Sequence, residues 1–220
     1  MTDNLKTPRQ LKSEQTKRTI LDAAASIIRE HGVEYVTVSN VCKAAGVSVG
    51  SFYHHFGDKE ELLCRYLDGA FNSRRAQFEA IAGEDVVANV LEFYRLYHLF
   101  LLEQGLEFVK SYYVATNSGI YSYMSYLRGP RSSSPLFQTI DRLLRQAKEE
   151  GWLAEDCQPD RLQYELSLLE KGVIFDWCLC DGFYDLSQQS SILMSRYLRW
   201  AVSEKYLRKF GWRPAPDSLR

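Results

Sequence analysis

The stretch that decides the fold is residues 37–56, TVSNVCKAAGVSVGSFYHHF. It predicts two short helices joined by a tight turn. Thr37 can cap the first helix, because its hydroxyl can accept a hydrogen bond from an unpaired backbone N–H of the opening turn. Gly46 ends that helix, since the turn needs a left-handed residue and glycine has no Cβ to clash. Ser48 is placed to cap the second helix.

The second helix has one edge for the protein core and another that suits a DNA groove. Phe52 and Phe56 lie four residues apart and form the buried edge. The opposite edge has no acidic residue and carries Val49, Gly50, Tyr53 and His54. A DNA major groove admits one α-helix, whose N-terminal residues contact the base edges. The sequence therefore predicts a helix-turn-helix that reads DNA.

This stretch resembles the DNA-binding segment of the TetR family of bacterial transcription regulators. The pattern of that family is T-[V/T]-x-x-[V/I]-A-x-x-A-G-V-S-x-G-[T/S]-[F/L]-Y-x-[H/Y]-F, followed by x-x-K-x-x-L. The chain matches it from Thr37 through Lys59 and Leu62, with Cys42 in place of the usual alanine. The resemblance rests on residues 14–66, and beyond them it extends only to a general helical layout.

The resemblance implies which side chains face DNA. The start of the recognition helix is formed by Ser48, Val49, Gly50 and Ser51. A glycine inside a helix costs ~1 kcal/mol against alanine, and close approach of the backbone to DNA is a reason to keep one there. Phosphate contacts, which position the protein without reading sequence, are implied for Thr37, Tyr53, His54 and Lys59. Ser39 can serve either role.

Composition and charge fit a globular protein without a membrane segment. The chain has 220 residues and a net charge of −1, and no apolar run approaches the ~18 residues of a membrane span. Residues 1–57 hold seven Lys/Arg and five Asp/Glu, with five of the cations before Ile20. This arm could neutralise phosphates or enter a minor groove, or it could be a solvated tail. The five scattered cysteines predict free thiols in a reducing cytoplasm.

The rest of the chain predicts an all-α fold of about nine helices. A first helix, capped by Ser13 or Thr16, runs to His31 and packs behind the helix-turn-helix. The expected later helices span residues 58–82, 85–103, 106–113, 135–150, 160–180 and 187–207, with mostly loop at 117–135. The expected domains are a flexible basic arm (1–13), a DNA-binding unit (14–75), an effector-binding and dimerisation unit (76–208) and a C-terminal tail (209–220).

The aromatic density of the second unit predicts a ligand pocket. Such pockets are mostly apolar with a few polar groups, and tyrosine supplies both a ring and a hydroxyl. The resemblance implies a small organic effector held among these helices. The candidate effector-binding residues are Tyr94, Tyr97, Tyr112, Tyr113, Tyr126, Phe175 and Trp177. The alternative is that these rings only fill a helical core.

The last two long helices carry more large apolar residues than one face needs. The resemblance implies that they form a four-helix bundle with a second subunit, and two copies of a helix-turn-helix can read two half-sites. The candidate interface residues are Leu162, Leu166, Leu169, Val173, Ile192, Leu193, Tyr197 and Trp200. The alternative is complete burial within one subunit.

An enzyme is disfavoured, because no nucleophile–base pair, Gly-rich phosphate loop or metal-ligand spacing is found. His54 and His55 could be read as a metal pair, but adjacent helical residues point about 100° apart. We expect no catalytic residue, metal or cofactor. The sequence indicates a cytoplasmic homodimeric repressor that a small organic effector releases from double-stranded operator DNA. The alternatives are a ligand-dependent activator and a thiol-based redox sensor using Cys157 or Cys178.

Overall fold

The computed structural model describes residues 7–114 and 135–213. Over these residues the chain is all-helical, as the sequence predicted. The elements are α1 (Pro8–His31), the 3-10 helix η1 (Val33–Tyr35), α2 (Val38–Ala45), α3 (Val49–His55), α4 (Lys59–Asn72), α5 (Arg75–Glu79), α6 (Val86–Gln104), α7 (Leu106–Tyr112), α9 (Pro135–Glu149), α10 (Pro159–Leu179), α11 (Leu186–Ala201) and α12 (Glu204–Phe210).

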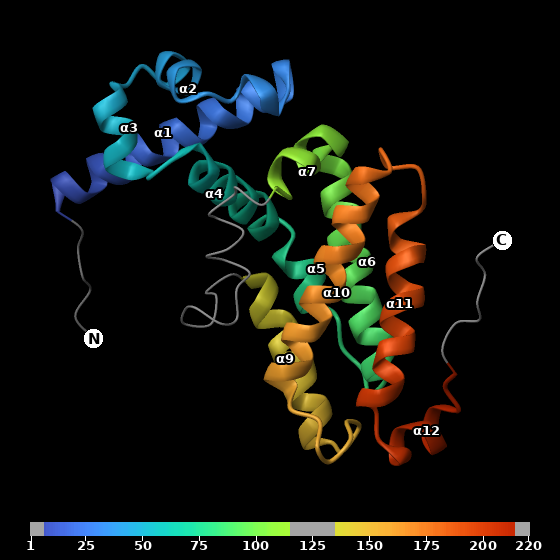
Figure 1. The fold of residues 1–220 in the computed structure, drawn as a ribbon. Helices are drawn as coiled ribbons and strands as arrows, with labels where there is room; N and C mark the ends of the chain where they lie inside the picture. The colour runs from blue at the N-terminus through green and yellow to red at the C-terminus, as the bar shows by residue number, and fades with distance from the viewer. Residues whose placement is uncertain (1–6, 115–134, 214–220) are drawn as a thin grey trace.

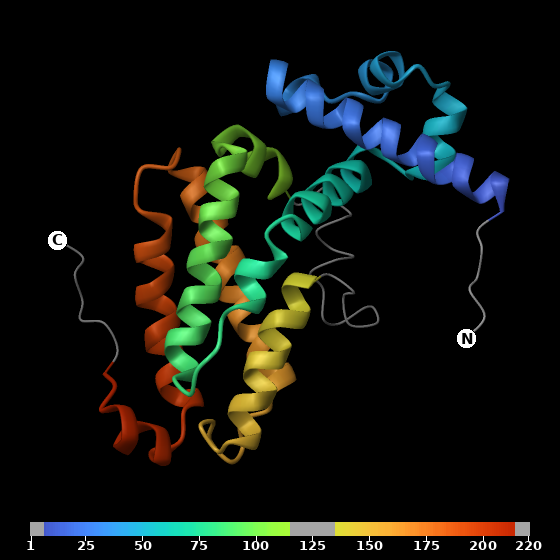
Figure 2. The same ribbon diagram turned by 180° about the vertical axis from the view of Figure 1, so that it is seen from behind.

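The molecule consists of a small helical unit and a larger bundle. Helices α1, α2 and α3 lie together at one end, and α4 leads from them toward the bundle (Figures 1 and 2). In the bundle, α6 packs against α11, α9 and α7, and α10 packs against α11 and α9. The hydrophobic core therefore has one part behind the helix-turn-helix and another between α6, α9, α10 and α11.

The first helix begins earlier than expected. The hydroxyl of Thr7 accepts a hydrogen bond from Gln10 N (3.3 Å), and Gln10 Oε1 accepts one from Thr7 N (2.7 Å). This capping box, with Pro8 at the first helical position, starts α1 at Pro8. A cap at Ser13 or Thr16 was thus wrong, and Thr16 instead donates to Lys12 O within the helix (3.0 Å). Residues 8–13 of the expected flexible arm are helical.

Two expected helices are each broken in two, which gives eleven α-helices in the described part of the chain rather than about nine. The helix expected at 58–82 stops at Asn72 and resumes at Arg75. The break brings the rings of Phe71 and Phe78 together, with centroids 4.4 Å apart. Seven residues of continuous helix would separate them by about 10 Å. The break therefore lets both rings enter the core.

The last expected helix divides into α11 and α12. Val202 is extended and forms an isolated antiparallel bridge with Leu153, in the turn between α9 and α10. Ser203 N donates to Trp152 O (2.9 Å), and Ala154 N donates to Ala201 O (2.8 Å). These backbone hydrogen bonds fasten the end of α11 to the bundle and turn the chain into α12.

Several expected helix ends are confirmed. Gly32, Gly46 and Gly105 follow the last residues of α1, α2 and α6, and each has a positive φ. The loop expected at residues 117–135 lies almost wholly outside the described residues, as does Tyr126. None of the described helices combines the length and apolar character that a membrane span requires.

Candidate nucleic-acid interface and core cavities

The helix-turn-helix has the caps and the turn that its sequence predicts. Thr37 Oγ1 accepts a hydrogen bond from Asn40 N (3.1 Å) at the start of α2. Ser48 Oγ accepts one from Ser51 N (3.1 Å) at the start of α3. Between the helices Gly46 adopts φ 64° and ψ 32°, a left-handed conformation that disfavours a side chain. These three residues fix how α3 leaves α2.

The inner edge of α3 is anchored in the core of the small unit. Phe52 and Phe56 are fully buried, and their ring centroids lie 5.6 Å apart. Val41 of α2 is buried with them, and the Lys17 ammonium of α1 lies 5.7 Å from the centre of the Phe56 ring. With these rings held inward, the opposite edge of α3 must face solvent.

The expected DNA contacts are mostly exposed and lie within one short stretch of the chain, residues 37–59. Tyr53 and Val49 are 55% and 50% exposed. Ser51 is half-buried, and the other members of the set are exposed: Thr37, Ser39, Ser48, Val49, Gly50, Tyr53, His54 and Lys59. Their contacts with DNA remain a prediction. We call the exposed side chains of this set within residues 37–59 the recognition surface.

The part of the chain that the structure describes does not account for the glycine at position 50. A Cβ built there would meet, among the described residues, only Ser48 Oγ, at 3.9 Å. Gly50 lies within α3 and is not among the residues with a positive φ. Alanine would therefore fit here without backbone strain and without a clash with the described residues.

Two features near the recognition surface were not foreseen. A groove of about 490 Å³ runs between α1 and α2 and includes Tyr35, Asn40 and Lys43. Lys43 is exposed and lies about one and a half helical turns after Thr37. This spacing from an expected phosphate contact could have marked Lys43 as a candidate DNA contact. The second feature is His55, whose pKa is lowered mainly by desolvation and further by the nearby charges of His54 and Lys17. The ring of His55 therefore favours its neutral form.

In the bundle, most of the expected effector-binding rings are buried. Tyr97 and Tyr113 share a hydrogen bond between their hydroxyls (2.6 Å), and Tyr112 is hydrogen-bonded to the Cys64 thiol of α4. Trp177 Nε1 donates to Tyr184 O (3.1 Å). Burial is the main cause that raises the pKa of Tyr97. These buried hydroxyls have protein partners, so much of the aromatic cluster serves as core.

Phe175 does not belong to this cluster. Its side chain is 51% exposed on the outer face of α10, so an effector role inside the bundle is wrong for it. The error is one of helical phase, because Phe175 and the buried Trp177 are two residues apart and face away from each other.

A small cavity lies between α6, α9 and α10. Its volume is about 20 Å³, room for about one water molecule. Its described lining residues are Phe93, Tyr94, Tyr97, Phe137, Ile140, Gln163, Ser167 and Glu170. Tyr94 and Tyr97 of the expected effector set line it, whereas Tyr112, Tyr113 and Trp177 lie outside this lining. We call it the inner cavity.

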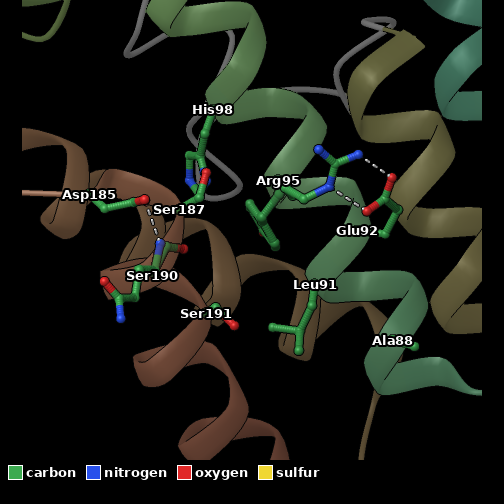
Figure 3. Close-up of a pocket in the computed structure, with 11 residues that line it drawn as sticks. Ala88, Leu91, Glu92, Arg95, His98, Asp185, Ser187, Ser190 and Ser191 are labelled. Carbon is green, nitrogen blue, oxygen red and sulfur yellow. Dashed lines mark hydrogen bonds and ion pairs between the residues drawn. The ribbon is translucent and has the colours of Figure 1, made fainter. Parts of the chain in front are cut away.

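A wider groove of about 350 Å³ lies on the other side of α6, between α6 and α11. Figure 3 shows His98, Ser187 and Asp185 at one end, and Leu91 and Ala88 at the other. Arg95 forms a two-pronged ion pair with Glu92 along its edge (2.6 and 2.7 Å). Tyr94 lines both this groove and the inner cavity, so a single layer of side chains separates them.

A buried polar cluster forms part of that layer, and sequence reasoning missed it. His98 and Glu170 are 1% and 2% exposed. His98 Nε2 contacts Glu170 Oε1, and His98 Nδ1 lies 3.1 Å from Ser187 Oγ. The Ser190 hydroxyl donates to Glu170 Oε2 (2.7 Å). The cluster joins α6, α10 and α11.

The sequence held a signal for Glu170. It occupies the buried face of α10 together with Leu162, Leu166, Val173 and Trp177, at helical spacing. An acid at a position where its neighbours on the face are apolar is a candidate functional residue.

The expected dimer-interface residues divide into three groups. Leu162, Leu166 and Val173 are buried inside the protomer, so their assignment to a surface is wrong. The half-buried members are Leu169, Ile192, Leu193 and Tyr197, whereas Trp200 is 86% exposed. These three residues of α10 pack inside their own bundle, which agrees for them with the alternative of burial within one subunit.

A second apolar stripe on α10 faces outward instead. Leu168, Phe175 and Leu179 are exposed and follow helical spacing, and Gly172 lies between them. A Cβ at Gly172 would meet nothing described within 4 Å. We call these four residues the outer stripe.

The buried thiols are poorly placed for redox chemistry. Burial raises the pKa of Cys64 and of Cys178 to about 11. Desolvation also raises the pKa of the half-buried Cys157. Since the thiolate is the reactive form, these shifts argue against a sensor built on Cys157 or Cys178.

Comparison with known proteins relates the small unit to a family of regulators. The family model described as "Bacterial regulatory proteins, tetR family" matches residues 20–65. The chain is 38% identical over 82 residues to the HTH-type transcriptional repressor KstR2 of Mycobacterium tuberculosis H37Rv, covering 37% of this chain and 39% of that protein. It is 38% identical over 63 residues to the regulator UidR of Escherichia coli K12, covering 29% and 30%. The matches thus span less than half of these relatives.

Solved structures share the fold over nearly the whole chain. FadR of Thermus thermophilus, a TetR family repressor in complex with lauroyl-CoA, has a TM-score of 0.61 at 20% identity, covering 91% of this chain and 97% of that one. RolR in complex with resorcinol has a TM-score of 0.57 at 19% identity, covering 94% and 98%. At these identities the likeness concerns the fold.

Proposed function

The chain belongs to the TetR family of bacterial regulatory proteins, and from this premise we propose that it is a homodimeric, sequence-specific transcription regulator. In this proposal it is a cytoplasmic repressor that a small organic effector releases from double-stranded operator DNA. The matched relatives are transcriptional regulators, which supports regulation rather than enzymatic catalysis.

The recognition surface is the observation that carries the proposal. A pair of capped helices presents hydroxyls and a tyrosine to solvent, Lys59 is exposed at the start of α4, and the aromatic edge of α3 is buried in the core. Base edges would be read at the start of α3, and phosphates would be held by Thr37, Tyr53, His54 and Lys59. The unexplained Gly50 fits a helix whose backbone lies against DNA.

The outer stripe supports a homodimer. Exposed leucines and a phenylalanine at helical spacing form a surface that a second copy can cover, and Trp200 of α11 is a further exposed aromatic residue. Gly172 would let the two α10 helices approach closely. We therefore propose an interface formed by the outer stripe with Leu169, Ile192, Leu193, Tyr197 and Trp200.

The effector site proposed here is the inner cavity and its surroundings. Relatives of this fold hold lauroyl-CoA or resorcinol, which supports a ligand-responsive core. Tyr94 and Tyr97 line the cavity, and the shared hydroxyl bond to Tyr113 and the Tyr112–Cys64 contact continue from it toward α4. In domain terms we propose a DNA-binding unit of residues 8–75 and an effector and dimerisation unit of residues 76–208.

A pair of alanine variants tests the DNA-binding proposal. Tyr53→Ala should weaken binding to operator DNA, mapped by footprinting of the DNA upstream of the gene, and should leave helicity intact. Phe183→Ala is the control, because Phe183 is an exposed aromatic residue (92%) that lies between α10 and α11, outside the helix-turn-helix. Equal affinities of both variants and the wild type over a salt titration would exclude the proposed contact.

A further inference from the structure

Glu170 is a buried carboxylate that stability alone does not explain. Removing an ionised carboxylate from water is costly unless it is paired and hydrogen-bonded, and His98 and Ser190 each hold one of its oxygens. Replacing such a buried pair with apolar side chains of similar volume is often neutral or stabilising. The neighbours of Glu170 on the same face of α10, Leu166 and Val173, are apolar. A functional reason for the acid is therefore worth seeking.

The surroundings of the carboxylate favour a positive charge. It lines the inner cavity together with four aromatic rings, those of Phe93, Tyr94, Tyr97 and Phe137. Of the eight described residues around the cavity, none is lysine or arginine. Aromatic faces attract cations, and a carboxylate adds a direct ion pair. Burial, and then the Glu170 carboxylate, raise the pKa of Tyr94, which lines the same cavity.

We propose that Glu170 anchors a small organic cation with an aromatic or apolar body, and that compounds of this class are the effectors. The inference rests on the proposed function for its regulatory part. Because the inner cavity has room for only about one water molecule, binding must move its rim. Phe137 is half-buried near the start of α9, and its carbonyl accepts a hydrogen bond from Gln163 Nε2 (3.2 Å). Turning this ring outward enlarges the cavity at its rim.

The same carboxylate couples the cavity to α11. A cationic ligand competes with His98 and Ser190 for the two oxygens of Glu170. Ser187 and Ser190 belong to α11, and His98 reaches toward them from α6 (Figure 3). Binding thus loosens the polar contacts between α6, α10 and α11. Because α11 carries Trp200 of the proposed dimer interface, a ligand in the cavity can alter the spacing of two subunits.

Three probes that share one ring test the charge preference on the wild-type chain. Benzylamine, benzyl alcohol and benzoate are titrated by calorimetry and thermal shift near neutral pH, where benzylamine is an ammonium. We expect benzylamine to bind at least about tenfold more tightly than benzyl alcohol and to raise Tm, and benzoate not to bind. Benzoate binding as tightly as benzylamine, or no binding by any probe at millimolar concentration, would overturn the inference.

Two variants then identify the anchor. Glu170→Gln keeps the shape and removes the charge, so benzylamine should lose about tenfold in affinity while benzyl alcohol is unchanged. Ser190→Ala keeps the carboxylate and removes a competitor, so benzylamine should bind at least as tightly as to the wild type. Loss of benzylamine binding in both variants alike would contradict an anchor at Glu170. If Glu170→Gln does not fold, as judged by circular dichroism, the ranking of the three probes on the wild type decides.

The regulatory part has a separate readout. Benzylamine should release the wild-type chain from its operator, and Glu170→Gln should need about tenfold more of it. Probe binding is measured without DNA, so a chain that binds no operator would refute the proposed function and leave the cation site standing. Tight benzylamine binding without operator release would overturn the assignment of cations as effectors.

Discussion

Gly46 and Gly50, four residues apart, are glycine for different physical reasons. Gly46 is required by its own backbone, since its left-handed conformation disfavours any side chain. Gly50 has neither such a conformation nor a close neighbour within the described chain. Stability and DNA binding should therefore respond to them in different ways.

Replacing Gly50 should separate stability from binding. Gly50→Ala should raise the free energy of unfolding by up to about 1 kcal/mol, because glycine weakens a helix. Operator affinity should fall about tenfold or more, or ~1.4 kcal/mol, if the backbone lies against DNA. Urea unfolding and a DNA titration measure the two effects. Gly69→Ala is the control, an exposed position inside α4 with free space around it, and should stabilise without weakening DNA binding.

The cysteines should differ sharply in reactivity. Cys180 is exposed, whereas Cys42, Cys64 and Cys178 are buried, and burial raises the pKa of each of these three thiols. A raised pKa lowers the thiolate fraction at every pH below it. A thiol reagent at mildly alkaline pH should label Cys180 first and the buried three only on unfolding. Rapid labelling of Cys178 in the native protein would reopen the redox alternative.

At the scale of helices, the sequence predicted those ends that depend on local chemistry. The caps at Thr37 and Ser48 and the stop at Gly46 involve neighbours within a few residues, so their residue types alone indicate them. The capping box at Thr7 was equally local, and it was missed because the basic arm was read as a tail.

The two helix breaks could not be predicted in the same way. The break after Asn72 allows two rings to stack in the core, and the one after Ala201 follows from pairing with the distant Leu153. Neither site has a glycine or proline to mark it. Tertiary packing decided these boundaries, and no local residue type reports such packing.

The turn between α2 and α3 makes its own prediction. Gly46→Ala should lower the free energy of unfolding by about 1–2 kcal/mol, because the added Cβ strains a left-handed residue although space is free around it. Gly46→Asn should cost less, since asparagine tolerates that conformation. Thermal or urea unfolding of the two variants measures the difference. An equal loss of unfolding free energy in both variants would indicate that a steric contact of the new side chain, and not the left-handed backbone conformation, causes the loss.

At the scale of the whole molecule, the recognition surface was predictable and the bundle interior was not. The recognition surface lies within one short stretch of the chain, residues 37–59, where helical spacing over one or two turns indicates which residues share a face. The latter depends on helices far apart in sequence. Phe175 was therefore placed inside, Leu162, Leu166 and Val173 were placed outside, and the contact of His98 with Glu170 could not be seen.

The outer stripe should control assembly. Phe175→Glu should give a monomer in sedimentation equilibrium, because a charge at the centre of an apolar interface cannot be buried unpaired. Its helicity should be unchanged, since the side chain is 51% exposed in the protomer. Leu11→Glu is the control, at 54% exposure on α1. A dimer that survives Phe175→Glu would move the interface elsewhere on the molecule.

The helix α4 can convert a small rotation at the bundle into a larger displacement of the recognition surface. It spans 14 residues, Lys59–Asn72, which is about 21 Å of rise, and joins the bundle to the recognition surface. Pivoting about its bundle end by about 10° carries the far end through about 3.7 Å, close to the spacing of one base-pair step, about 3.4 Å. A lever of this length turns a tilt too small to disturb either hydrophobic core into a register error against the DNA.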